Sequence, residues 1–275
     1  MTAPERTTDD KTAPDNGVAD RLPRHVAENR RKWDETADDW VAAGERSWQQ
    51  DEPTWGIWGV PESDLQMLPR DMSGLSAVEL GCGTAYVSAW LARRGASVTG
   101  IDNSQRQLDT ARRLATEHGV TLDLHHGNAE TTPFADVSFD FAISEYGAAI
   151  WCDPYVWIPE AYRILRPGGR LVFLGNHPIF SVCSPWDGAT VGERLVRPYF
   201  ELHQLDWTQV EIDPGGIEFN LPISGWFELF RRVGFAVEDF REPRPAVPSA
   251  EVRFAATASW AHRFPSEHVW KLRKT

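Results

Sequence analysis

Two closely spaced glycines, Gly81 and Gly83, stand where an apolar run meets a helical pattern in this 275-residue chain. Such a strand, loop and helix junction lets a ligand approach the main chain and directs the amides of the helix start toward it. A second apolar run, 97–102, ends in Asp102, which places a carboxylate at a neighbouring strand tip. That carboxylate can accept hydrogen bonds from the hydroxyls of a ribose. The spacing therefore predicts an adenosine-containing cofactor, with an ordinary tight turn as the alternative.

Two residues beside the loop distinguish between adenosine cofactors. A dinucleotide fingerprint, G-x-G-x-x-G, would need glycine at position 86, where this chain has Tyr86. Glu79 precedes the first glycine, and its carboxylate would repel a diphosphate but attract the ammonium group of a methionine. Both residues favour S-adenosylmethionine, so an NAD-linked oxidoreductase is the weaker alternative.

A family resemblance lies in residues 79–84 (ELGCGT) and in Asp102, which are similar to motif I and the following acid of class I S-adenosylmethionine-dependent methyltransferases. Ala85 replaces the third glycine of the family pattern. Residues 33–273 resemble the ubiquinone/menaquinone-methyltransferase-like group, including the turn and strand at 165–173. The resemblance implies S-adenosyl-L-methionine as cofactor and a small-molecule methyl acceptor. A non-catalytic protein that binds the same cofactor is the alternative from another class.

The resemblance also implies which residues hold the cofactor. Asn128 and Ala129 lie in a loop similar to the family's adenine-binding turn, where the asparagine oxygen can accept from the adenine amino group and the alanine amide can donate to a ring nitrogen. Gln107 stands where family members often contact adenine, although a helix-capping box would also explain it. The segment with Trp33 and Trp40 is similar to one that folds over the cofactor, with simple packing as the alternative. The predicted set is Glu79, Gly81, Cys82, Gly83, Asp102, Asn103, Gln107, Asn128, Ala129, Glu130, Ser144, Glu145, Trp33 and Trp40.

The elements that must position these groups alternate between strand and helix patterns. With the resemblance, they predict an α/β fold: a Rossmann-like, seven-stranded, mostly parallel sheet in the order 3-2-1-4-5-7-6, with helices on both faces. Residues 1–20 are predicted to be a disordered tail, and residues 21–70 are predicted to form an N-terminal helical cap or lid. Residues 71–275 predict the methyltransferase domain, with a substrate-covering insertion after the fifth strand at about 175–224.

Composition limits the partners and the compartment. A net charge of −12 argues against a nucleic-acid partner, which would favour clustered lysine and arginine. The chain has no apolar run of the about 20 residues that a membrane-spanning helix needs. Three cysteines without metal-ligand spacing, and an N-terminus without an apolar signal core, predict a reduced cytoplasmic protein with no bound metal. No feature of the composition predicts the oligomeric state.

Aromatic residues outside the core strand and helix pattern are the candidates for acceptor binding. Large aromatic side chains often line ligand pockets, although packing is their more common use. Trp55 and Trp58 also flank glycines in a hinge-like run that is typical of a lid. The predicted acceptor-binding set is Trp55, Trp58, Trp151, Trp186, Tyr199 and Trp207.

Candidates for catalysis stand at the expected carboxyl ends of the fourth and fifth strands. A neutral oxygen or nitrogen nucleophile loses a proton around methyl transfer, and a histidine can accept that proton near neutral pH. His177, directly after the fifth strand, is the first candidate, followed by Tyr146 and Glu145 after the fourth. The alternatives are that His177 caps the backbone beside Pro178, or that an acceptor already ionised needs no base.

Overall fold

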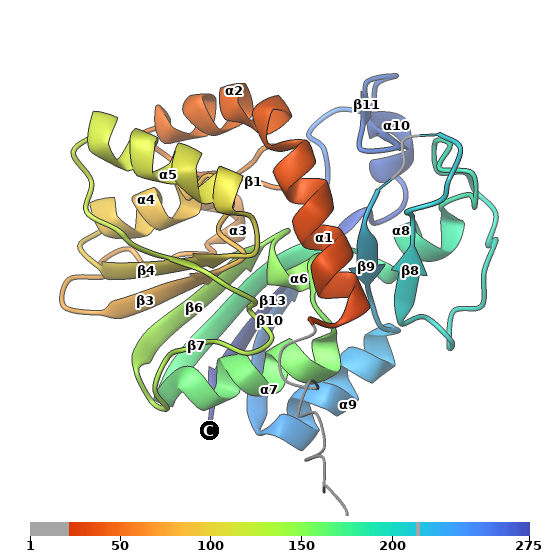
Figure 1. Cartoon of the computed structure of the whole chain (residues 1–275). Coiled ribbons are helices and arrows are strands. Elements are labelled where there is room, and N and C mark those ends of the chain that lie inside the picture. The colour runs from red at the N-terminus through yellow and green to blue at the C-terminus, as the bar shows by residue number, and fades with distance from the viewer. Residues whose placement is uncertain (1–21, 213–214) are drawn as a thin grey trace, which may run out of the picture.

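The computed structural model describes residues 22–212 and 215–275, so the predicted tail at 1–20 lies outside the described residues. Its centre is a seven-stranded sheet with the order β10-β13-β7-β6-β3-β4-β5 (Figure 1). Read from β5, this is the predicted order 3-2-1-4-5-7-6, and only β13 runs antiparallel to its neighbours β7 and β10. The predicted α/β fold is therefore confirmed. The strands are β3 (Ser76–Leu80), β4 (Ser97–Asp102), β5 (Asp123–His126), β6 (Phe139–Glu145), β7 (Leu165–Asn176), β10 (Phe235–Arg241) and β13 (Glu267–Lys274).

Helices cover both faces of this sheet, with α4 and α5 on one face and α7 and α9 on the other (Figure 1). Apolar residues at helical spacing direct each helix inward: Leu108, Ala111 and Ala115 are the buried stripe of α5, and Trp157 and Ala161 belong to that of α7. Because β3 runs parallel to its neighbours β4 and β6, the carboxyl ends of these three strands lie together at one edge of the sheet. The helices are α4 (Tyr86–Arg93), α5 (Gln105–Glu117), α7 (Pro154–Ile164) and α9 (Ile223–Val233).

The first described elements form a cap on the α5 side of the sheet. Helices α1 (Arg24–Glu35) and α2 (Ala37–Trp48) pack against α5, and α1 also reaches the helix α6 (Ala148–Trp151) (Figure 1). Trp48 is fully buried, and its indole donates a 2.8 Å hydrogen bond to the Thr84 carbonyl in the glycine loop. The cap is therefore fastened to the loop predicted to bind cofactor. A hairpin and a short helix follow it: β1 (Thr54–Trp55), β2 (Val60–Pro61) and α3 (Glu62–Leu65).

The segment between β7 and α9 lies beside α1, on the side away from α4 and α5 (Figure 1). A second segment, between β10 and β13, packs with it, and Val182, Leu205, Ala256 and Trp260 from the two segments share one hydrophobic cluster. The part played by the second segment was not predicted, because strands of two residues show no readable alternation. The elements are α8 (Pro178–Cys183), β8 (Gln204–Asp206) and β9 (Ile217–Phe219), then β11 (Val252–Arg253), β12 (Ala256–Thr257) and α10 (Ala258–Ala261).

Candidate functional site

Gly81 brings the loop after β3 against the turn after β6. Its φ is +78°, and a Cβ built on it would lie 2.6 Å from the Gly147 Cα. Any side chain at position 81 would therefore push two backbones apart. Ala85, which replaces the third glycine of the family pattern, also takes a left-handed conformation, with φ of 60°. The loop keeps its shape despite that methyl group, at a strain of about 1–2 kcal/mol.

Asp102 links the glycine loop to the start of α5. Its Oδ2 accepts from the Gly83 amide at 2.7 Å, and its Oδ1 accepts from the Ser104 amide at 2.8 Å. Burial raises the pKa of this carboxyl above its ordinary value. A Cβ built on Gly83 would meet nothing closer than Gln107 Oε1, at 4.0 Å. This open cradle beside a carboxylate with lone pairs to spare fits the adenosine ribose of S-adenosylmethionine.

Glu79 is bound to the first turns of α4. Its Oε2 accepts from the Ser88 amide at 2.7 Å and from the Ser88 hydroxyl at 2.5 Å. Only 2% of the residue is exposed, and desolvation raises the pKa of the carboxyl to about 8. The predicted contact with the cofactor ammonium is therefore limited to Oε1, which has no donor within the described part of the chain.

Asn103 and Glu130 hold the cap helix α1 in this structure. The Asn103 side chain accepts from Arg30 Nε at 2.9 Å and donates to the Val26 carbonyl at 2.8 Å. Glu130 Oε1 lies 2.7 Å from His25 Nε2. Both side chains were predicted to bind the cofactor, and these contacts give each of them a structural role as well. The sequence could not show them, because the partners lie more than seventy residues earlier in the chain.

The predicted adenine turn retains some capacity for a ligand. Asn128 Oδ1 accepts from the Glu130 amide at 3.0 Å, so a contact with the adenine amino group would use its second lone pair. Ala129 is buried beside it. The Gln107 amide donates to the Ser104 hydroxyl at 3.2 Å, which is the predicted helix cap, while its side-chain oxygen stands at the edge of the Gly83 cradle. Cys82 is buried as well, and burial raises the pKa of its thiol.

Trp33 and Trp40 form one aromatic group with Trp151. The ring centroids of Trp33 lie 5.3 Å from those of Trp40 and 5.2 Å from those of Trp151. Trp40 also stacks on Phe254, with centroids 5.8 Å apart and an interplanar angle of 7°. Trp151 therefore groups with the cap tryptophans. Phe254, in the turn between β11 and β12, was missed because an isolated exposed phenylalanine carries no sequence signal.

Side-chain hydrogen bonds connect the end of β6 to β3, to α4 and to the segment after β1. Ser144 is fully buried, and its hydroxyl donates to the Leu80 carbonyl at 2.7 Å, which joins β6 to β3. Glu145 accepts from the Tyr86 hydroxyl and, at 2.9 Å, from the Gly56 amide. Ser144 thus positions the strand ends, and Glu145 holds the glycine-rich run of the cap.

Tyr146 and Glu267 form a second tyrosine–carboxylate pair, between the ends of β6 and β13. The Tyr146 hydroxyl donates to Glu267 Oε1, which also accepts from the Ile57 amide at 2.9 Å. Glu267 Oε2 is buried without a hydrogen-bond partner among the described residues, and burial raises the pKa of this carboxyl to about 7. Sequence reasoning missed Glu267, which is the first residue of β13.

Trp55 is a core residue, which corrects its predicted place in the acceptor site. It is 0% exposed, its indole donates to Glu62 Oε2 at 2.7 Å, and its ring lies 5.3 Å from that of Trp90. No face of the indole is left for a ligand. Trp58 is partly exposed and donates to the Ser266 hydroxyl at 2.9 Å, so it lies beside the end of β13.

His177 caps α8. Its Nδ1 accepts from the Ile179 amide at 3.0 Å, while Nε2 lies 3.1 Å from Glu242 Oε1 without hydrogen-bond geometry. Burial lowers the pKa of the imidazole to about 4. The ring is therefore neutral at pH 7. Because Nδ1 accepts a hydrogen bond, the ring proton lies on Nε2, and the one basic lone pair is already used by the Ile179 amide.

The three aromatic residues of the insertion have different surroundings. Tyr199 accepts from the Ile223 amide at 2.9 Å and so supports the start of α9. Trp186 is 64% exposed, and Trp207 is partly buried. Both indoles lie against the guanidinium of Arg197. Arg197 was not predicted.

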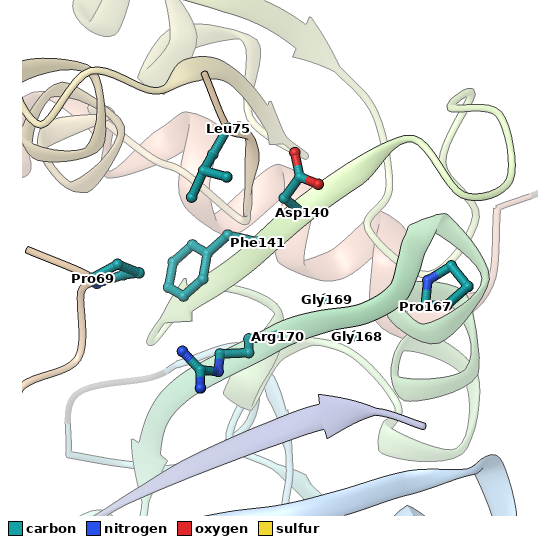
Figure 2. A pocket seen from close by; sticks show the side chains of 8 residues that line it. All are labelled: Pro69, Leu75, Asp140, Phe141, Pro167, Gly168, Gly169 and Arg170. Atoms are coloured by element: carbon teal, nitrogen blue, oxygen red, sulfur yellow. The ribbon is translucent and has the colours of Figure 1, made fainter. Parts of the chain in front are cut away.

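A hollow of about 370 Å³ lies at the end of the sheet away from the glycine loop (Figure 2). Leu75 and Asp140, at the amino ends of β3 and β6, line it, so it is remote from the glycine loop. Within residues 22–212 and 215–275, no group of three or more His, Cys, Asp or Glu is arranged to hold a metal. None of the described helices is long and apolar enough to cross a membrane.

Similarity to known proteins centres on the same elements. The family model described as a methyltransferase domain matches residues 78–173. The 2-methyl-6-phytyl-1,4-hydroquinone methyltransferase 2 of Oryza sativa subsp. japonica is 35% identical over 130 residues, 46% of this chain and 37% of that protein. The demethylmenaquinone methyltransferase of Listeria monocytogenes is 36% identical over 185 residues, 63% of this chain and 75% of that protein. The crystal structure of a putative S-adenosylmethionine-dependent methyltransferase from Listeria monocytogenes has a TM-score of 0.64 at 20% identity, over 85% of this chain and 99% of that one, which shows a shared fold.

Proposed function

The chain belongs to the S-adenosylmethionine-dependent methyltransferases, and on that premise we propose that it methylates a small organic acceptor held between the cap and the insertion. The two similar proteins named above act, by their names, on a hydroquinone and on demethylmenaquinone. Phenols and quinols are therefore the first acceptors to test.

The observation that carries the proposal is a group of buried carboxylates without cations. Glu79, Asp102 and Glu145 meet at the carboxyl ends of β3, β4 and β6, and among the described residues none of them forms an ion pair. Their pKa values are all raised by desolvation, which means that the site favours a positive guest. When bound, S-adenosylmethionine supplies a sulfonium-activated methyl group and an ammonium group, and both carry positive charge.

In this proposal the cap excludes water from the site. Asp34 Oδ1, where α1 meets α2, accepts from the Ser104 hydroxyl at 2.6 Å, next to Asp102. Trp33, Trp40 and Trp151 form the aromatic group behind it. Desolvation strengthens the attraction between buried carboxylates and a cationic ligand, and orientation of two reactants supplies most of the rate in such a transfer.

For the acceptor's proton, Tyr146 and Glu267 are better placed than His177. Glu267 Oε2 has no partner in the described structure, and a pKa of about 7 suits a general base at neutral pH. Glu145, the third candidate, already accepts from Tyr86 and Gly56. In this proposal Tyr146 orients the Glu267 carboxylate, and His177 supports α8.

Calorimetry with S-adenosylhomocysteine and with NADH tests the cofactor assignment first. The expected result is saturable binding of the former alone. Incubation with S-adenosylmethionine and a panel of phenols, quinols and amines should then form S-adenosylhomocysteine with at least one acceptor. Tight binding with no turnover on any acceptor would favour the non-catalytic alternative, and NADH binding would overturn the proposal.

We further infer that the protein works in the reducing cytoplasm. Cys82, Cys152 and Cys183 are buried and free, and burial raises the pKa of each thiol, so none is poised to form a disulfide. Mass spectrometry of the protein alkylated directly in a cell lysate should find all three thiols reduced. A disulfide in that sample would contradict the inference.

A further inference from the structure

Arg197 is a buried arginine in the insertion, on the acceptor side of the molecule. Only 7% of it is exposed, and one guanidinium nitrogen, Nη1, donates to the Ser181 carbonyl in α8. Its Cζ lies 4.1 Å from the ring centroid of Trp186 and 5.0 Å from that of Trp207. Two indoles and one carbonyl thus hold the guanidinium in a fixed plane.

The other edge of the guanidinium has no partner. Nε and Nη2 are both buried and make no hydrogen bond to any described residue. These two nitrogens carry the parallel N–H groups that bind a carboxylate or phosphate in bidentate fashion. Leaving two charged donors buried and unpaired is costly, which indicates that the structure keeps them for a group that is not part of the chain.

Glu218, a buried acid whose charge acts on Arg197, does not satisfy this edge. Glu218 feels the charge of Arg197, but the two residues do not form an ion pair in the described structure, and Glu218 Oε2 instead accepts from Asn176 Nδ2 at 3.2 Å. Burial raises the pKa of Glu218 to about 7, so near neutral pH it is only partly ionised. Arg197 therefore forms no ion pair with any described residue, although Glu218 lies within the range of its charge.

Hydrogen bonds connect Arg197 to the end of β7. Ser181, whose carbonyl receives the guanidinium, accepts with its hydroxyl from Asn220 Nδ2 at 2.9 Å. Asn220 Nδ2 also donates to the Asn176 carbonyl at 2.8 Å. Asn176 is the last residue of β7 and pairs with Glu267. The arginine is thus fixed relative to the strand ends where the acceptor is proposed to react.

We propose that Nε and Nη2 of Arg197 bind a carboxylate group of the methyl acceptor, with Trp186 and Trp207 flanking the group it carries. This assignment rests on the proposed function. A carboxylate suits the site better than a phosphate dianion, because Glu218 would repel a second negative charge. Trp186, largely exposed and bound through one 3.1 Å hydrogen bond to the Val196 carbonyl, is the side chain that would move aside to admit a ligand and then return to flank it.

Calorimetry on the full chain saturated with S-adenosylhomocysteine tests the proposal. The probes are benzoate, 4-hydroxybenzoate and hexanoate, with benzamide as a neutral analogue and inorganic phosphate as the other oxyanion. At least one carboxylate should bind saturably, and benzamide should bind about 30-fold more weakly than benzoate if benzoate is that ligand. Arg197→Gln should weaken the carboxylate about 30-fold or more, and Arg197→Lys less, since a lysine keeps the charge without the fork.

Two further variants keep the test decisive. Arg194→Gln removes an exposed arginine of the same insertion and should change nothing. Glu218→Gln removes the competing acid and should tighten carboxylate binding a few-fold, a gain that cannot come from misfolding. Melting temperature and S-adenosylhomocysteine affinity, measured for every variant, show whether each one is folded.

The outcomes separate the two proposals. If S-adenosylhomocysteine does not bind the wild-type protein, the proposed function fails. If it binds but no carboxylate does, or if carboxylate binding survives Arg197→Gln, the assignment of Arg197 is overturned alone. Phosphate binding as tight as that of the best carboxylate and equally dependent on Arg197 would also overturn an acceptor carboxylate. A loss of stability without a gain in binding for Glu218→Gln would show that Arg197 and Glu218 serve only each other.

Discussion

The two ends of the site differ in how their buried polar groups are satisfied. On the cofactor side, Asp102 accepts hydrogen bonds from main-chain amides of the glycine loop and of the start of α5, and Glu79 accepts one from an amide of α4. On the acceptor side, atoms of Arg197, Glu267 and His177 are buried without hydrogen-bond partners in the described structure. A group satisfied by nearby backbone fixes a loop in advance, whereas a buried group left unpaired marks a place where a ligand can complete the structure. This difference supports the proposals that the cofactor binds in the preformed loop and that the acceptor binds at the insertion.

The largest effect is expected from a residue that sequence reasoning put on the acceptor side. Trp55→Ala should cost about 3–5 kcal/mol of unfolding free energy, because it empties a fully buried site against Trp90. Urea unfolding measures the loss, and Trp58→Ala, at a partly exposed position, is the control with a small effect. If Trp55→Ala left stability intact and instead raised the acceptor KM, Trp55 would belong to the acceptor site and not to the core.

The two glycines of the loop should respond differently. Gly81→Ala should destabilise the fold by about 3 kcal/mol or more, since its Cβ would lie 2.6 Å from the Gly147 backbone. Gly83→Ala meets open space and should cost only about 1–2 kcal/mol of left-handed strain, yet it would fill the cradle and weaken S-adenosylhomocysteine binding. Thermal unfolding and calorimetry on both variants check this. Equal stability losses in both variants, with unchanged binding, would show that the cofactor does not bind at Gly83.

Asp102→Asn tests the cofactor side directly. The loss of a charge-assisted hydrogen bond to the ribose should weaken S-adenosylmethionine binding by about 1–3 kcal/mol. Asp123→Asn, an acid on the adjacent strand β5 with 69% of its side chain exposed, should have no effect. Calorimetry showing unchanged affinity for Asp102→Asn would mean that this carboxylate serves only the loop.

The last prediction concerns the pH dependence of stability. Burial raises the pKa of Glu79 from its ordinary value of 4.5 to about 8, so the folded protein holds a proton that the unfolded chain releases between these values. Its stabilising contribution is therefore complete below pH 4.5 and falls as the pH rises toward 8, by at most about 1.4 kcal/mol per pH unit. The difference in unfolding free energy between wild type and Glu79→Gln, measured from pH 5 to 8, should show this slope. A flat difference would mean that Glu79 is ionised in the folded protein.

Much of the cofactor side could be predicted because its signals are local. Gly81 and Gly83 are two residues apart, and Asp102 follows Gly83 by 19 residues at the end of the next strand. Strand, loop and helix follow one another in the chain, so hydrophobic periodicity and turn residues suffice to predict them. The order of the sheet came from the family resemblance, and the structure has that order.

The amino-acid sequence by itself determined the α/β fold, the glycine loop and the acid beside it, because each depends on spacing within a short stretch. Tertiary structure alone decided that Trp55 is core, that His25 reaches Glu130, and that Arg197 lies between two indoles with a free edge. These facts arise from segments up to about a hundred residues apart, and burial of a charged or aromatic group depends on which distant surfaces close around it. A tryptophan or an arginine has the same side-chain chemistry in a protein core and in a ligand site. Only the packing around it decides which of the two roles it has.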